Sequence, residues 1–138
     1  MLNNKARSFV TIMVVVALSA LLLRLAIHRI IAYKIKQNQL LAQVNLKLLS
    51  TAMENYAKDN KNTYPVNIDL LTKNKPVYLE RDYLAASSIR GYEYDCQRLE
   101  ATGYSCTAFP VNCQLTGKTV YTVSTGGLIM TQACDSRE

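Results

Sequence analysis

Four cysteines are the residues of this chain whose type and spacing most directly indicate chemistry. Cys96, Cys106, Cys113 and Cys134 lie towards the C-terminal end, and none belongs to a Cys-x-x-Cys pair. The single histidine, His28, lies far from them, which argues against a zinc site. An even number of cysteines in a small, turn-rich region favours two disulfides formed in an oxidising compartment. Buried free thiols are the alternative.

No other residues form a catalytic set in the sequence. It contains no Gly-x-Ser-x-Gly, phosphate-binding loop or metal-spaced cluster, so we expect no catalytic residue, metal or cofactor. Glu93 and Asp95 flank a tyrosine of an expected strand, where solvation is a simpler role than proton transfer. The nine tyrosines could stack on sugars or bases, but ring packing in a core is favoured. We therefore expect a protein that is not an enzyme.

The cysteines belong to a segment whose apolar residues alternate with a period of two. "GYEYDC" places Tyr92, Tyr94 and Cys96 on one face, and "GYSCTAFP" does the same for Tyr104, Cys106 and Ala108. "KTVYTVSTGGLIM" predicts a hairpin with positive φ angles at Gly126 and Gly127. These segments predict an antiparallel sheet of three or four strands.

The first hairpin favours one disulfide pairing among three. If its loop centres near Ala101, Cys96 faces Cys106 across the two strands. Cys113 is then left with Cys134. This pairing is the most economical one, and the spacing alone does not remove the other two.

The preceding half of the chain predicts a long helix. No proline or glycine occurs before Pro65, so a helix can run from about Phe9 to Asp59. The alternative is two helices with a break in the polar run Lys34 to Asn38. One apolar stripe is expected to need a partner; it consists of Leu41, Val44, Leu48, Ala52 and Tyr56, widened by Leu49 and Met53.

A turn and a loop are expected between this helix and the sheet. Asp59, Asn60 and Asn62 tolerate turn conformations, and Pro65 forces Tyr64 into an extended conformation. Asn67 then caps a short helix from Ile68 to Thr72. Residues 73–90 are expected to be an irregular loop with four apolar anchors, namely Tyr78, Leu79, Tyr83 and Leu84.

The start of the long helix is apolar enough to span a membrane. Phe9 to Leu23 carry no charge, and Arg24 is the single charged residue in the longer segment from Phe9 to Ile27. At about 1.5 Å per residue this segment is about 28 Å long, close to the thickness of a bilayer's hydrocarbon core. Arg24 can pair with an acid of a partner or extend its charge to the lipid surface. A cleaved signal peptide is the competing explanation, but no Ala-x-Ala type site follows the apolar run.

The charges support a membrane rather than a nucleic acid as the partner of this region. Residues 1–36 carry six basic side chains and no acid, whereas residues 37–138 carry ten of each, so the net charge of +6 belongs to the first part. Cations beside an apolar span contact anionic lipid, and a neutral distal part lacks the basic face that phosphate binding needs. Basic residues on both sides of the span leave the topology open, but disulfides would place the C-terminal part outside the cytoplasm.

Three stretches together resemble the type IV pilins and the pseudopilins of type II secretion systems. "RSFVTIMVVVAL" is similar to the family's processing site and lipid-embedded start, "LKLLSTAMENYAKDNKNTYPVNIDLL" to the end of its long helix, and "GYSCTAFPVNCQLTGKTVYTVSTGGLIM" to its sheet region. The resemblance implies cleavage between Ser8 and Phe9 by a prepilin peptidase, methylation of the new N-terminus, and assembly of subunits through the apolar helix. The assembly residues that it implies are Phe9, Ile12, Met13, Val16 and Leu23.

Two positions depart from the family's pattern. Ser8 stands where the family usually has glycine before the cut. Met13 stands where the family has a glutamate that pairs with the N-terminal amine of a neighbouring subunit, and no acid precedes Glu54. The departures favour a minor or tip-located subunit, or a pilin-like protein that does not polymerise.

The sequence therefore predicts an α+β, pilin-like fold in which a long N-terminal helix, membrane-embedded in its first half, packs on a small antiparallel sheet. We expect a basic leader-like segment (1–8), a transmembrane or filament-core half (9–27), an amphipathic half (28–60) and a globular head (61–138). The expected function is a structural subunit of a pilus-like or type II secretion filament. An unprocessed single-pass membrane protein with a partner-binding head is the alternative, and an adhesive or ligand-binding minor pilin is a third hypothesis.

Overall fold

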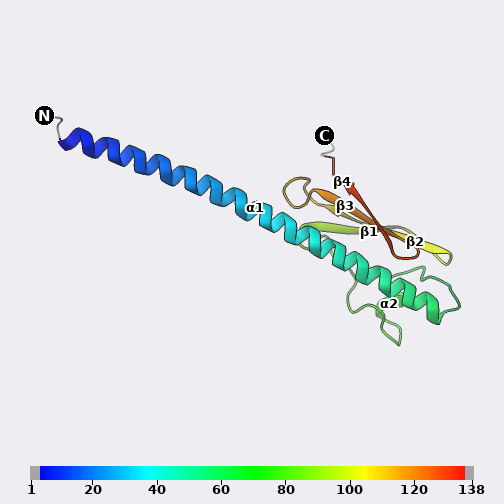
Figure 1. The fold of residues 1–138 in the computed structure, drawn as a ribbon. Coiled ribbons are helices and arrows are strands. Elements are labelled where there is room, and N and C mark those ends of the chain that lie inside the picture. Colours follow the sequence, from blue (N-terminus) through cyan, green and yellow to red (C-terminus); the bar gives the residue numbers. More distant parts are fainter. Residues whose placement is uncertain (1–3, 136–138) are drawn as a thin grey trace. The chain divides into compact units, whose positions relative to one another are not determined.

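The computed structural model describes residues 4–135, with side chains from Phe9 onward. Its elements are α1 (Asn4–Asp59), α2 (Asp69–Thr72), β1 (Tyr92–Glu100), β2 (Gly103–Pro110), β3 (Thr119–Ser124) and β4 (Leu128–Ala133) (Figure 1). By its contacts the chain divides into two units, residues 1–34 and residues 35–138. The fold class is α+β, with helix α1 packed on a four-stranded antiparallel sheet.

Helix α1 begins at Asn4, earlier than the sequence predicts, and ends at Asp59 as expected. The polar run from Lys34 to Asn38 is helical throughout, so the alternative of a break there is wrong. The helix ends where Lys61 and Asn62 take positive φ angles of 55° and 60°. An asparagine tolerates this left-handed conformation better than most residues, which explains why the polar run after Asp59 stops the helix.

The sheet has the strand order β1-β2-β3-β4, and every neighbouring pair is antiparallel. Glu100 pairs with Gly103 and Cys96 with Cys106, so the first turn falls at Ala101, as the sequence predicts. Gly126 and Gly127 take the expected positive φ values of 85° and 74° in the turn between β3 and β4. The described residues therefore form four strands, the higher of the two numbers that the sequence predicts.

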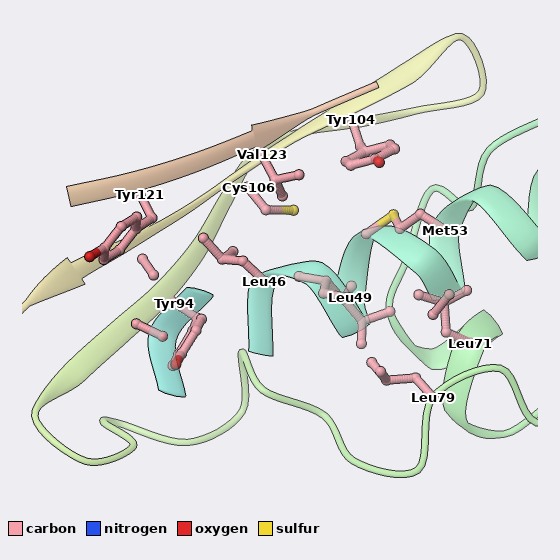
Figure 2. Close-up of a cluster of buried hydrophobic side chains, with 14 of the residues drawn as sticks. Leu46, Leu49, Met53, Leu71, Leu79, Tyr94, Tyr104, Cys106, Tyr121 and Val123 are labelled. Atoms are coloured by element: carbon pink, nitrogen blue, oxygen red, sulfur yellow. The ribbon is translucent and has the colours of Figure 1, made fainter. Parts of the chain in front are cut away.

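The core of the second unit lies between residues 35–59 of α1, the sheet and the loop that carries α2 (Figure 1). Figure 2 shows Leu46 reaching towards Cys106 and Val123 of the sheet, while Met53 lies near Leu71 of α2. The sheet contributes the tyrosines and small residues predicted from its period of two: Tyr92, Tyr94, Tyr104, Cys106 and Ala108 are all buried.

The predicted helix stripe is wrong in its first half. Leu41, Val44 and Leu48 are exposed, at 38%, 46% and 49%. The buried face is instead made of Ile35, Ala42, Leu46, Leu49, Ala52, Met53 and Ala57. Apolar residues occur on several sides of this part of the helix, so periodicity alone could not select the side that meets the sheet.

The connection after the helix agrees with the prediction in outline. Leu79 is buried, and Tyr78, Tyr83 and Leu84 are partly buried against the core, as anchors should be. Helix α2 begins at Asp69 with Ile68 in the cap position, one residue later than expected. Asn67 still contributes, because its side-chain oxygen accepts a hydrogen bond from the Asp69 N–H at 3.1 Å.

Candidate functional sites in the apolar helix and the head

The first unit presents an apolar helical surface. Each side chain from Phe9 to Lys34 is exposed. The five assembly residues expected from the sequence, Phe9, Ile12, Met13, Val16 and Leu23, are between 58% and 65% exposed. This helix is long and apolar enough to cross a membrane, a criterion that a signal sequence would also meet.

One polar side chain within this surface is satisfied by the helix itself. The Ser19 hydroxyl donates a hydrogen bond to the Val16 carbonyl at 2.9 Å. A hydroxyl bonded to its own helix carries little desolvation cost in lipid or against another helix. Ser19 is therefore compatible with an apolar environment. Of the expected cleavage site, Ser8 and Phe9 both lie inside α1, and the side chain of Ser8 is outside the described part.

The second unit holds a cluster of polar groups centred on Glu54, which we call the Glu54 cluster (Ser50, Glu54, Tyr64, Tyr104 and Gly126). One Glu54 carboxylate oxygen accepts hydrogen bonds from the Tyr104 hydroxyl at 3.0 Å and the Gly126 N–H at 2.8 Å. The other oxygen accepts from the Tyr64 hydroxyl at 3.0 Å. Because the Tyr104 proton goes to Glu54, the Ser50 hydroxyl donates to Tyr104 at 2.8 Å.

The electrostatics of the Glu54 cluster keep its phenols protonated. Burial, assisted by the Glu54 carboxylate, raises the pKa of Tyr104 to about 12, although the Ser50 hydrogen bond opposes the shift. Burial and then the Glu54 hydrogen bond also raise the pKa of Tyr64. Phenols with raised pKa values donate hydrogen bonds at neutral pH and are poor bases or nucleophiles. The cluster therefore fits a structural clamp better than a catalytic site.

The Glu54 cluster connects four parts of the head. Ser50 and Glu54 lie on α1, Tyr64 follows the helix, Tyr104 lies on β2 and Gly126 lies in the turn between β3 and β4. The Tyr64 N–H also donates to the Ala101 carbonyl at 3.0 Å, and the rings of Tyr64 and Tyr104 are 5.5 Å apart. Sequence reasoning missed Glu54 as a site residue. Its isolation as the first acid of the chain was the available signal.

Three amides of α1 attach the helix to the other end of the sheet. Asn38 donates to the Thr116 carbonyl at 3.0 Å, Gln39 to the Thr119 hydroxyl at 2.9 Å and Asn45 to the Tyr94 hydroxyl at 2.9 Å. Of the polar run that made a helix break conceivable from the sequence, Asn38 thus binds the head. The three amides set which side of the helix faces the sheet.

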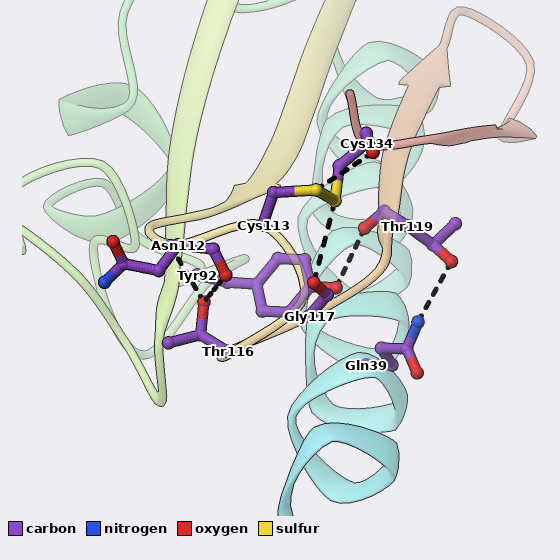
Figure 3. The surroundings of a disulfide bond; sticks show 8 residues. All are labelled: Gln39, Tyr92, Asn112, Cys113, Thr116, Gly117, Thr119 and Cys134. Atoms are coloured by element: carbon purple, nitrogen blue, oxygen red, sulfur yellow. Dashed lines mark hydrogen bonds between the residues drawn. A yellow bond between two sulfur atoms is a disulfide. The ribbon is translucent and has the colours of Figure 1, made fainter. Parts of the chain in front are cut away.

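The four cysteines form two disulfides, Cys96–Cys106 and Cys113–Cys134. The pairing is the one that the first hairpin favours in the sequence. Cys96 and Cys106 join β1 to β2, and Cys113 joins the loop after β2 to the residue that follows β4 (Figure 3). Backbone bonding supports the second link, because the Cys134 N–H donates to the Lys118 carbonyl at 3.0 Å. The C-terminal end of β4 is therefore held at two points.

A shallow groove of about 340 Å³ lies in the head, lined by Leu48, Thr51, Ala52 and Asn55 of α1 and Tyr78, Leu79, Glu80 and Tyr83 of the loop. Glu80 is its single ionisable group other than the two tyrosines. No nucleophile and base face each other in it. Among the described residues there is also no group of three or more metal-binding side chains.

Neither a protein-family model nor a curated protein sequence matches the chain. Among solved structures, the non-core minor pilin PilV of Neisseria meningitidis is similar to it. The identity is 19% and the TM-score 0.40, over 75% of this chain and 94% of that one. A similarity at this level does not establish a shared family.

Proposed function

We propose that this chain is a structural subunit of a pilin or pseudopilin type. It assembles with copies of itself or with related subunits through the apolar helix and holds its head outside the cytoplasm. The observation that carries the proposal is the contrast between the two units. Every side chain from Phe9 to Lys34 is exposed, whereas the buried core residues all lie from Ile35 onward.

Such a helix needs an apolar environment that the chain's own described residues do not provide. A bilayer supplies it before assembly, and neighbouring helices supply it afterwards. The resemblance of "RSFVTIMVVVAL" to a pilin processing site points to the same use, with Ser8 and Phe9 flanking the cut made by a prepilin peptidase. The filament, either a pilus or a type II secretion pseudopilus, is the finer part of the proposal.

The position of Glu54 bears on how this subunit assembles. Met13 stands where the resembling family has the glutamate that pairs with a neighbour's N-terminus, and Glu54 is the first acid in the chain. Glu54 already accepts three hydrogen bonds inside the head. It is therefore engaged, and assembly would rest on apolar packing alone. A subunit of this kind suits a minor or terminal place in a filament better than the main repeat.

The test uses the full chain in its native cell. Val16→Arg places a charge in the middle of the apolar helix, and we expect it to abolish recovery of the chain in sheared filaments. Leu115→Arg is the matched control, because Leu115 is 67% exposed in a loop of the head. It should be recovered like the native chain.

Mass spectrometry of the filament fraction then measures the N-terminus. A chain starting at Phe9 is the expected product. An intact Met1 on incorporated chains would contradict processing. Native chain found only as a monomer in membranes would contradict assembly and favour the unprocessed single-pass protein.

A further inference from the structure

The two outer strands of the sheet are protected very differently. β1 carries Glu93, Asp95, Arg98 and Glu100, and its register shifts between Cys96 and Arg98. Charges and bulges of this kind discourage an edge strand from pairing with another chain. β4 reads Leu-Ile-Met-Thr-Gln-Ala and contains no charge, proline or glycine. It is the unprotected edge of the sheet.

β4 is also uncovered. Of its six residues only Ile129 is partly buried, and Leu128 and Met130 are 63% and 54% exposed. Ile129, Thr131 and Ala133 lie opposite Val123, Tyr121 and Thr119, on the face of the sheet that meets the helix. Thr131 and Ala133 remain exposed on this face, so helix α1 does not cover them.

The hydrogen-bond pattern shows which backbone groups of β4 are available. The Cys134 N–H donates to Lys118, so alternate residues of β4 direct their backbone groups towards β3. Residues 128, 130 and 132 therefore bond to β3, whereas the N–H and C=O groups of Ile129, Thr131 and Ala133 point away from the sheet. Apart from the strand ladders, no backbone hydrogen bond within the described part of the chain involves these three residues.

We propose that β4 is a homotypic pairing strand, which joins antiparallel to β4 of a second copy. The register centres on Thr131, so that Thr131 faces Thr131 of the other copy and Ile129 faces its Ala133. Three such pairs exchange about six backbone hydrogen bonds and make one continuous sheet of the two heads. The inference is independent of the proposed assembly through the apolar helix.

Three observations favour a second copy as the occupant. A neutral strand meets its own copy without charge repulsion, whereas β1 of another copy would bring three acids to the edge. A threonine pair across two strands already occurs in this sheet, where the hydroxyls of Thr107 and Thr122 are 3.2 Å apart. Finally, the Cys113–Cys134 disulfide and the Glu54–Gly126 hydrogen bond fix both ends of β4. The strand is therefore already ordered, and pairing costs little conformational entropy.

The test is cysteine crosslinking of the full chain in detergent micelles and in native membranes. A hydrogen-bonded antiparallel pair separates Cα atoms by about 5.5 Å, which a disulfide can span, so Thr131→Cys should give a symmetric dimer. Ile129→Cys is the control on the same edge, because two copies of residue 129 would be roughly 14 Å apart at about 3.4 Å per residue. Leu115→Cys controls for random collision.

We expect Thr131→Cys to crosslink roughly five times as much as either control, and a mixture of Ile129→Cys and Ala133→Cys chains to crosslink again. Thr131→Lys, which puts two ammonium groups opposite each other, should lower a concentration-dependent dimer signal of the otherwise native chain, while Thr131→Val should keep it. Near-ultraviolet circular dichroism checks that each variant is folded.

Two results would overturn the proposal. One is equal crosslinking at residues 115, 129 and 131 in folded protein. The other is a Thr131→Cys chain that crosslinks only to a different protein. Both results are independent of the apolar helix. A native chain that is absent from filaments but still crosslinks through Thr131→Cys would contradict helix assembly and leave the pairing of β4 intact.

Discussion

Among the described charged residues of the head, Glu54 accepts the most hydrogen bonds from distant parts of the fold. Its carboxylate accepts from two phenols and from one backbone N–H, and it does so beside buried Tyr104. Hydrogen bonds to a charged acceptor are among the stronger ones in proteins, and removing the acceptor leaves donors without a partner. The residue is therefore a stabilising element at the junction of helix, loop and sheet.

Glu54→Ala should lower the free energy of unfolding by about 2–4 kcal/mol, because three donors lose their acceptor. Urea unfolding of the full chain in detergent measures the change. Glu80→Ala is the matched control, since Glu80 is exposed and should change stability by less than about 0.5 kcal/mol. Equal effects of the two variants would contradict the clamp.

Two buried tyrosines make the head sensitive to alkali. Burial raises the pKa values of Tyr92 and Tyr104 from 10.0 to about 12. Below pH 10 both are protonated in the folded and the unfolded chain, so stability is complete. As the pH rises from about 10 to about 12, the unfolded chain loses these protons first, and stability falls by up to about 1.4 kcal/mol per pH unit for each tyrosine.

Urea midpoints at pH 8, 9, 10 and 11 should therefore be constant at first and then decline. Tyr104→Phe should make the decline shallower, since it removes one of the two tyrosines whose pKa is raised most. Tyr33→Phe, which changes a tyrosine that is 64% exposed, should leave the slope as it is. A decline that starts well below pH 9 would show that another group is responsible.

At the scale of elements, the local sequence determines which segments become helix or strand and where they end. The polar residues after Asp59 and the glycine pair at 126 and 127 predicted a helix end and a turn, because both depend on φ angles that few residues accept. The alternation in β1 and β2 predicted which tyrosines are buried. In each case the cause lies within a few residues of the effect.

The buried side of α1 and the Glu54 cluster could not be predicted in the same way. Leu41, Val44 and Leu48 are as apolar as the residues that are buried, and the choice between sides depends on bonds from Asn38, Gln39 and Asn45 to residues 49–80 positions away. Glu54 likewise meets Tyr104 and Gly126 across the fold. Sequence periodicity contains no information about such distant partners.

At the scale of the whole molecule, the two units differ in whether they bury their own apolar side chains. The core begins at Ile35, and no buried side chain belongs to residues 9–34. A chain that starts at Ile35 should therefore fold without detergent, with a melting temperature within about 5 °C of that of the full chain in detergent. Circular dichroism and size-exclusion chromatography measure both properties.

A shortened chain that aggregates or lacks the near-ultraviolet signal of its packed tyrosines would contradict this independence. Aggregation could also come from Leu40, Leu41, Val44 and Leu48, which remain exposed on the helix. Replacing all four residues with glutamine in the shortened chain separates the two causes, because none of them belongs to the core. Aggregation that persists in this variant would show that the head needs residues 1–34.

The bond between Glu54 and the turn at Gly126 spans 72 residues of sequence. A ribosome makes the helical side of this head first and the strands that cover it afterwards. Until then Leu46, Leu49 and Met53 have no sheet to lie against. The head therefore cannot close before β4 and Cys134 have left the ribosome, and its helical side stays uncovered until then.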